Sequence, residues 1–502
     1  MNKIIAGILS LLLICALILA IVFALNFSTI KEFSNSLISL TDQNHDSENI
    51  IFDFNNVDIF INSTKKLADN KIIKSFLKPE QREFIEAINK VIPEFQTVLN
   101  EIIVDEQKWI VIYQNSNEIR PTGGFMGSYS IIEINKGKLI SINTEDIYDA
   151  DGQFTGYFQA PSGVSKYLSS GKGLRLPDAN WHVDTTKSAE QILPFYALGN
   201  KTNIKGIVFV NLDFAKKLIK FIGPINLPDY NTIITENNID EVLRSRRDDF
   251  FPGSTQKKHM LSQLLTKVRI HILSLNPEMI IRLSNLITDE IQNHNLQFYS
   301  INDQIDQVFD KYQMRQEVEL KNNTDYIYLV ESNVGINKAN KLINREVQLK
   351  KEDNSLKVSI NLTNNNEKPT QSKLSQLTEI VDNHNASDEA RVNNHLAYIN
   401  YQRVLVPQEW ELNSINYQNN EIFEYDNEIV EVGNDKFQQI GFLITLLEEE
   451  SSDLNLSFTT NSQNDSIYIQ HQPGLPATKY ILEYNQNKQE YTLENNQIIN
   501  YP

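Results

Sequence analysis

The stretch from Asn115 to Tyr129, NSNEIRPTGGFMGSY, places a charged side chain, Arg120, beside a glycine-rich turn. An apolar run, Trp109 to Tyr113, precedes it and is typical of a buried strand. Because glycines let backbone N–H groups approach an anion closely, one interpretation is an anion-binding site. The other interpretation is a hairpin turn that carries a surface arginine.

A second basic group, Arg244, Arg246 and Arg247, lies just before the segment that begins at Thr255, which has a helical pattern. Arginine is suited to bidentate contacts with phosphate oxygens, so three arginines within four positions could hold a pyrophosphate. The alternative is a solvated loop whose arginines pair with Asp248 and Asp249. Nothing in the local pattern decides between these two hypotheses.

Acidic residues between 145 and 151, with Asp149 and Asp151 at the end, offer only oxygen ligands. Such ligands suit Mg²⁺ or Ca²⁺, although the remaining positions of a calcium-binding loop are missing. His182, between Trp181 and Asp184, could act as a general base or could have a structural role in a turn.

Alternating strand and helix patterns must position these residues, and they predict an α/β domain over residues 107–315. The buried run from Ile207 to Val210 is followed by a helix from about Asp213, which Gly223 and Pro224 should end. Further helices are expected over residues 188–198, 255–274, 277–294 and 302–312. Short alternating runs separated by Asn- and Gln-rich turns predict an antiparallel β-sandwich over residues 325–502.

The N-terminal part carries a membrane signal and then a helical pattern. Residues from Ile4 to Phe27 contain no charge, which predicts a transmembrane anchor over residues 1–27, with a cleavable signal peptide as the alternative. Apolar residues at helical spacing predict a helical membrane-proximal region over residues 28–106. Nearly all of the chain would then lie on one side of the membrane, outside the cytoplasm.

Composition excludes several classes of function. The formal net charge of −18 is incompatible with an extended nucleic-acid-binding face, which must be basic. The single cysteine, Cys15, lies in the apolar N-terminal segment, so the rest of the chain has no disulfide, thiolate-bound metal or cysteine nucleophile. The signature motifs of P-loop nucleotide-binding proteins, zinc proteases and α/β-hydrolases are absent.

Four ordered stretches carry a resemblance to a bacterial envelope family of unknown function. They are NSNEIRPTGGFMGSY, LPDANWHVDTTKSAEQI, GIVFVNLDFAKKLIKFIGPINLP and YIYLVESNVGINKANKLINR, and they resemble domain-of-unknown-function family 4012 over roughly residues 105–345. This resemblance implies a place in the cell envelope and no particular chemistry.

More distantly, the segment from Ile207 to Leu265 is similar to the second half of a LytR-CpsA-Psr domain. Enzymes of that family transfer glycopolymers from a pyrophosphoryl-polyprenol carrier to the cell wall. The resemblance implies that Arg120 and the group Arg244, Arg246 and Arg247 bind pyrophosphate, and that Asp149 and Asp151 hold Mg²⁺. The family's acidic residue after its first arginine is replaced here by the run from Thr122 to Gly124.

Two functions follow as hypotheses. In the first, the protein is a single-pass, extracytoplasmic binding or scaffolding module without catalysis, whose partners are cell-surface glycans or proteins. In the second, it is a Mg²⁺-dependent glycopolymer phosphotransferase that uses the polyprenyl-pyrophosphate carrier. The lost acidic position favours the first, because fold similarity does not ensure activity.

Overall fold

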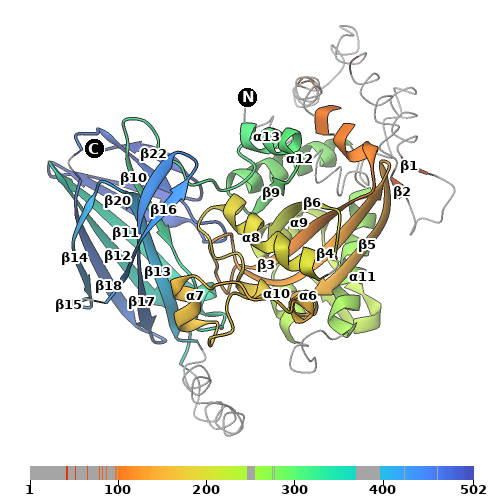
Figure 1. Ribbon diagram of the computed structural model, residues 1–502, viewed down its shortest axis with the longest axis horizontal. Helices are drawn as coiled ribbons and strands as arrows, with labels where there is room; N and C mark the ends of the chain where they lie inside the picture. The colour runs from red at the N-terminus through yellow and green to blue at the C-terminus, as the bar shows by residue number, and fades with distance from the viewer. Residues whose placement is uncertain are drawn as a thin grey trace, which may run out of the picture. The chain divides into compact units, whose positions relative to one another are not determined.

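The computed structural model describes residues 101–502 apart from 200, 246–254, 274, 276, 369–395, 423 and 461, and a few positions before residue 101. Contacts divide the chain into two compact units. The first unit contains the described residues within 1–114, 126–156 and 189–316, and the second contains those within 115–125, 157–188 and 317–502. Two segments of the predicted α/β domain, residues 115–125 and 157–188, therefore pack with the C-terminal strands (Figure 1).

A five-stranded sheet in the order β5-β4-β3-β6-β9 organises the first unit. Its strands are β3 (Gln107–Asn115), β4 (Phe125–Asn135), β5 (Lys138–Asp146), β6 (Ile204–Asn211) and β9 (Leu296–Ser300). β3 and β6 are parallel, whereas β5 and β9 run antiparallel to β4 and β6. The sheet is mixed, which agrees with the α/β class predicted for this region.

Helices and a small hairpin complete the first unit. The helices are α6 (Ile147–Gln153), α8 (Thr185–Leu198), α9 (Leu212–Ile222), α10 (Ile239–Ser245), α11 (Thr255–Leu273), α12 (Pro277–Gln292) and α13 (Asp303–Lys311), and α8 begins in the second unit. The hairpin pairs β7 (Ile225–Leu227) with β8 (Thr232–Ile234). α9, α10, α11 and this hairpin share one hydrophobic core.

The sequence explains where α9 begins and ends. The Asn211 side chain accepts hydrogen bonds from the N–H groups of Asp213 and Phe214, both at 3.1 Å, and so caps the first turn. Gly223 ends the helix with φ of +92°, a conformation that residues with a Cβ rarely adopt. The predicted helix from about Asp213 to Gly223 is confirmed.

Two sheets form the body of the second unit (Figure 1). The six-stranded sheet, in the order β16-β17-β13-β10-β19-β22, contains β10 (Asp325–Val330), β13 (Tyr398–Pro407), β16 (Asp426–Val432), β17 (Asp435–Leu446), β19 (Ser466–Gln470) and β22 (Gln497–Asn500). The seven-stranded sheet, in the order β15-β14-β18-β12-β11-β20-β21, contains β11 (Ile343–Glu352), β12 (Ser355–Asn364), β14 (Glu411–Tyr417), β15 (Asn420–Glu421), β18 (Ser451–Thr459), β20 (Thr478–Tyr484) and β21 (Asn487–Leu493).

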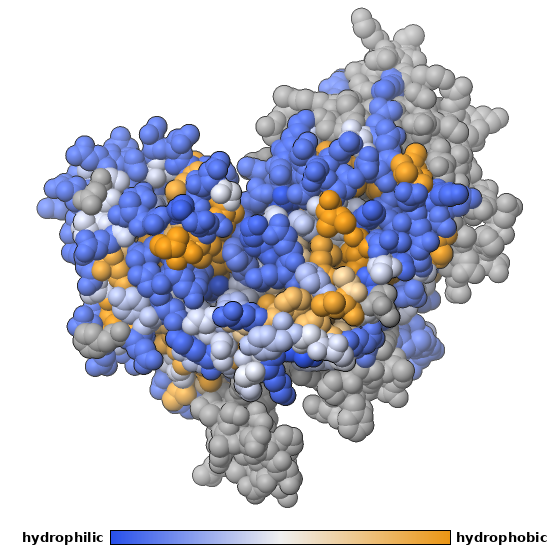
Figure 2. Space-filling view, viewed as in Figure 1, coloured by the Kyte–Doolittle hydropathy of each residue, from blue (hydrophilic) through white to orange (hydrophobic). Residues whose placement is uncertain are grey.

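Residues from both sheets share one hydrophobic core. In β12 the buried side chains alternate along the strand as Leu356, Val358, Ile360 and Leu362, which is the pattern of a strand with one buried face. A second cluster, which includes Val183, Val318, Tyr326 and Phe437, joins residues of segments 157–188 and 317–324 to the six-stranded sheet. The face of this unit seen in Figure 2 is mostly hydrophilic, with small apolar patches.

The sandwich prediction needs one correction, because the strands are not all antiparallel. β10 pairs with β19 in parallel, and β11 pairs with β20 in parallel. Local alternation of apolar and polar residues is the same for both directions, and the direction is set by connections that are distant in sequence. The coarse prediction of a strand-rich C-terminal region is confirmed.

The region predicted to be helical over residues 28–106 is described at only a few positions. Thr41–Asp42 and Ile51–Phe52 form two short antiparallel strands, β1 and β2, so this part of the prediction is wrong. Residues 96–98 and 100–104 are helical, as expected.

The predicted anchor over residues 1–27 lies outside the described residues. Within the described part of the chain, no helix has the length and apolar character needed to cross a membrane.

Candidate functional site

Arg120 lies in the loop that joins β3 to β4, and its side chain is buried, with 1% exposed. Two backbone hydrogen bonds close this loop: Glu118 N–H donates to the Asn115 carbonyl (3.1 Å), and Phe125 N–H donates to the Glu118 carbonyl (2.8 Å). The Arg120 guanidinium therefore does not reach solvent, in contrast to the surface arginine of the simpler interpretation.

Groups of the same unit bind four of the five guanidinium N–H donors of Arg120. Nε and Nη2 donate to Asp178 Oδ1, at 3.1 and 3.0 Å. Nη1 donates to the backbone carbonyls of Ile119 (3.1 Å) and Asn333 (2.5 Å). The two longest-range partners come from the second and the fourth motif of the sequence, so the loop, the segment around residue 178 and the end of β10 are held together by one cation.

Buried amide side chains complete the surroundings of Arg120. Gln472 Nε2 donates to the carbonyls of Arg120 (3.2 Å) and Glu331 (2.9 Å). Asn333 Nδ2 donates to Asn340 Oδ1 at 2.9 Å, and Asn333 N–H donates to the Ile119 carbonyl at 3.1 Å. We call Arg120, Asp178, Asn333, Asn340 and Gln472 the Arg120 cluster. Most of its polar groups have hydrogen-bond partners within the cluster or in the neighbouring residues Ile119 and Glu331, as is usual for buried polar groups.

The glycines of the turn have a packing role. A Cβ added to Gly124, whose φ is +146°, would lie 2.4 Å from the Asn115 carbonyl carbon. A Cβ on Gly474 would lie 2.3 Å from the Gly123 carbonyl oxygen. Glycine is required at both positions because backbone segments approach each other closely. The backbone of the turn thus packs against other backbone segments of the protein, at the place where the anion-site hypothesis expected a ligand.

A buried cation also lies next to the second motif. The Arg403 guanidinium is 4.9 Å from the centre of the Trp181 ring, and Nη1 donates to the Trp181 carbonyl at 3.0 Å. Burial lowers the pKa of Arg403 to about 10. Burial and the nearby charge of Arg403 lower the pKa of His182 to about 4. His182 Nδ1 accepts the Asp184 N–H at 3.0 Å, so this histidine is neutral and stabilises the local turn.

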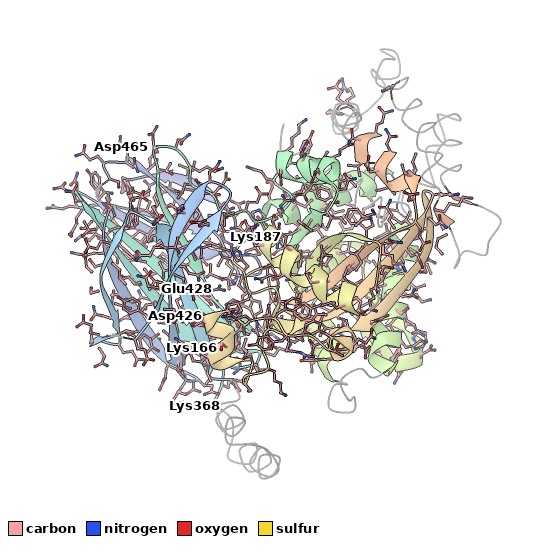
Figure 3. The ribbon with its side chains drawn as sticks, in the orientation of Figure 1. Lys166, Lys187, Lys368, Asp426, Glu428 and Asp465 are labelled. Atoms are coloured by element: carbon pink, nitrogen blue, oxygen red, sulfur yellow. The ribbon has the colours of Figure 1, made fainter. Side chains whose placement is uncertain are left out.

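Asp426, at the start of β16, fixes segment 157–188 to the six-stranded sheet. It accepts hydrogen bonds from Ser162 Oγ (2.9 Å), Lys166 Nζ (2.7 Å) and Tyr401 OH (2.7 Å), and Figure 3 shows Lys166 and Asp426 side by side. Burial opposes the charge of Asp426, but the hydrogen bond from Lys166 and those from Tyr401 and Ser162 together lower its pKa. Asp426 therefore holds segment 157–188 near its start, and Arg403 holds it at Trp181, within the second motif.

The other predicted site residues are not brought to Arg120 by anything the structure describes. Arg244 lies near the end of α10, and its side chain is outside the described part, as are Arg246 and Arg247. Asp149 and Asp151 lie in α6 of the first unit, whereas Arg120 belongs to the second. Among the described residues no group of three or more His, Cys, Asp or Glu side chains could hold a metal ion. The Mg²⁺ site remains a prediction.

Residues 105–247 match the model of a family described as "Protein of unknown function (DUF4012)". The predicted resemblance to domain-of-unknown-function family 4012 is thus confirmed over these residues, which include the first three motifs. The fourth motif, from Tyr326 to Arg345, lies beyond the match, yet it supplies two residues of the Arg120 cluster. No curated protein matches the chain.

Sequence reasoning missed most partners of Arg120. Asp178 and Asn333 lie within the second and the fourth motif, but no local pattern marks either as a partner of Arg120. One signal was present in the fourth motif: polar residues follow directly after the apolar run from Tyr326 to Val330. A solvated chain reversal there would not require three asparagines. A similar internal pair, Glu331 and Arg345, lies in the same motif with Oε1 and Nε 2.6 Å apart.

Proposed function

We propose that this protein is a single-pass, membrane-anchored protein of the cell envelope that acts outside the cytoplasm as a non-catalytic binding or scaffolding module. The uncharged segment from Ile4 to Phe27 supports the anchor. Lys3, directly before this segment, favours a cytoplasmic N-terminus and therefore supports an extracytoplasmic location for the residues that follow the segment.

The burial of Arg120 is the observation that carries the non-catalytic part of the proposal. A pyrophosphate-binding arginine must present its N–H donors to the ligand. Arg120 is 1% exposed and already donates four hydrogen bonds to Asp178, Ile119 and Asn333. Binding a phosphate would require breaking a buried ion pair, which costs several kcal/mol.

The architecture of the second unit supports a binding or scaffolding role. Its sheets present long strands with hydrophilic outer residues, and its interior contains paired charges such as Arg345 with Glu331. A rigid body of this kind suits contacts with glycans or proteins of the cell surface, which are the partners we propose. The alternative function, a LytR-CpsA-Psr-like phosphotransferase, would have to rely on Arg244, Arg246 and Arg247 with Mg²⁺ at Asp149 and Asp151.

One assay distinguishes the two functions. Full-length protein in detergent is incubated with isolated cell wall and a polyprenyl-pyrophosphate-linked, labelled glycan, with and without Mg²⁺. We expect the protein to remain on the wall after washing while the label stays on the lipid. Mg²⁺-dependent transfer of the label to the wall would overturn the proposal, and a protein that does not bind the wall would exclude wall glycan as its partner.

A further inference from the structure

A lysine and an aspartate lie buried against each other at one end of the second unit. Lys351, at the end of β11, is 3% exposed, and Asp325, at the start of β10, is 1% exposed. Lys351 Nζ is 2.8 Å from Asp325 Oδ2. β10 belongs to the six-stranded sheet and β11 to the seven-stranded sheet, so this pair connects the two layers.

Every donor of the ammonium group has an acceptor inside the protein. Besides Asp325, Lys351 Nζ donates to Ser462 Oγ (2.9 Å), the Ser462 carbonyl (3.2 Å) and Thr460 Oγ1 (3.3 Å). The ring of Tyr501 lies beside it, with its centre 5.8 Å from Nζ. These contacts hold the amine in a fixed position beside the carboxyl group.

The carboxyl group of Asp325 is surrounded by donors. Ser462 Oγ donates to Oδ1 (2.5 Å), Asn464 Nδ2 donates to Oδ1 (3.1 Å), and Tyr501 OH donates to Oδ2 (2.8 Å). Burial and the charge of Asp325 raise the pKa of Tyr501, which keeps its hydroxyl protonated as a donor. The backbone of Asp465, labelled in Figure 3, accepts the Tyr501 N–H at 2.9 Å and so positions that residue.

Such a pair is poised for condensation. Two charges removed from water carry a desolvation cost that their attraction does not fully offset. Forming an amide removes both charges at once and releases a water molecule. A fixed amine and carboxyl group in contact also react as if each were present at a very high local concentration.

We propose that Lys351 and Asp325 form an intramolecular isopeptide bond. The Nζ–Cγ bond forms, the bond from Cγ to Oδ1 breaks, and Oδ2 becomes the amide oxygen. The ammonium group loses two protons in total, and both end on Oδ1, which leaves as water. No oxidant, reductant or further reactant is needed.

Ser462 is positioned to carry a proton between the two groups. Its Oγ accepts from Lys351 Nζ and donates to Asp325 Oδ1, so the hydroxyl can take a proton from the amine and deliver it to the departing oxygen. The Tyr501 hydroxyl donates to Oδ2, where negative charge develops as the amine attacks the carbon. Ser462 and Tyr501 are thus assigned as a proton relay and an oxyanion donor for a reaction that occurs once per chain.

The direct test is the intact mass of the purified full-length protein. The bond predicts a mass lower than the sequence mass by one water molecule, and a branched peptide that joins the fragments containing Lys351 and Asp325 after proteolysis. Lys351→Arg and Asp325→Ala should each give their full sequence mass, whether or not they fold. A wild-type mass equal to the sequence mass, with separate linear peptides for both residues, would overturn the proposal.

Two comparisons separate the bond from an ordinary ion pair. Ser462→Ala keeps both reacting groups but lacks the relay. If Ser462 carries the proton, some freshly made Ser462→Ala chains should lack the isopeptide bond, and this fraction should fall with incubation time. Complete bond formation in freshly made Ser462→Ala would remove Ser462 from the mechanism. The exposed pair of Lys357 and Glu352, at 3.0 Å with 51% and 44% of the side chains exposed, serves as the internal control. Its peptides should remain linear, because water solvates both groups.

Discussion

Replacing Arg120 by alanine should destabilise the second unit strongly. The substitution leaves Asp178 Oδ1 without its two guanidinium donors, and the carbonyls of Ile119 and Asn333 lose theirs. Removing one partner of a buried ion pair costs roughly 3–5 kcal/mol. At roughly 2–4 °C per kcal/mol for a unit of this size, the melting temperature should fall by about 6–20 °C.

The measurement is thermal unfolding of full-length protein, followed by the near-ultraviolet signal of its tryptophan and tyrosine residues. Lys357→Ala is the matched control, because it breaks an ion pair of the same unit with 51% of the lysine side chain exposed. That loss should cost about 1 kcal/mol or less. If Arg120→Ala and Lys357→Ala have the same small effect, the structural assignment of Arg120 is refuted.

The remaining predictions concern backbone packing and a buried histidine. Gly124→Ala should lower the free energy of unfolding, measured with denaturant, by at least about 2 kcal/mol, because its Cβ would lie 2.4 Å from a backbone carbon. Gly152→Ala is the control and should be near neutral, because nothing lies within 4 Å of the new Cβ. Equal effects of the two substitutions would contradict the packing argument. Burial lowers the pKa of His471 to about 4, below the unfolded value near 6.5, so the unfolded state binds more protons in this window and stability falls as pH drops from about 6.5 to 4. Across that range the free energy of unfolding of wild type should fall by up to about 3 kcal/mol more than that of His471→Gln. Parallel pH profiles of the two free energies would disprove a role for His471.

Local pattern was enough to predict several elements of the first unit. The apolar run around Val208 and the amphipathic segment ending at Gly223 correspond to β6 and α9, because strand periodicity, a capping asparagine and a glycine stop all act within a few residues. The helices α11, α12 and α13 were predicted for the same reason.

The site could not be predicted in this way, because its contacts span long stretches of sequence. Arg120 and the carbonyl of Asn333 are separated by 213 residues, and Arg120 and Gln472 by 352. A charged side chain beside glycines is usually exposed, and no local pattern indicates that the distant carboxylate of Asp178 and the backbone carbonyl of Asn333 will bind it. For the same reason, the sequence did not indicate that residues 115–125 pack with the C-terminal strands.

If Arg120 is a structural residue and the protein a non-catalytic module, folded, full-length wild type should not bind pyrophosphate specifically. The measurement is equilibrium binding of a polyprenyl pyrophosphate, with and without Mg²⁺. We expect no saturable binding beyond that of a polyprenyl alcohol of the same length. Tight, pyrophosphate-dependent binding that weakens in Arg120→Lys, in a variant shown to be folded, would contradict it.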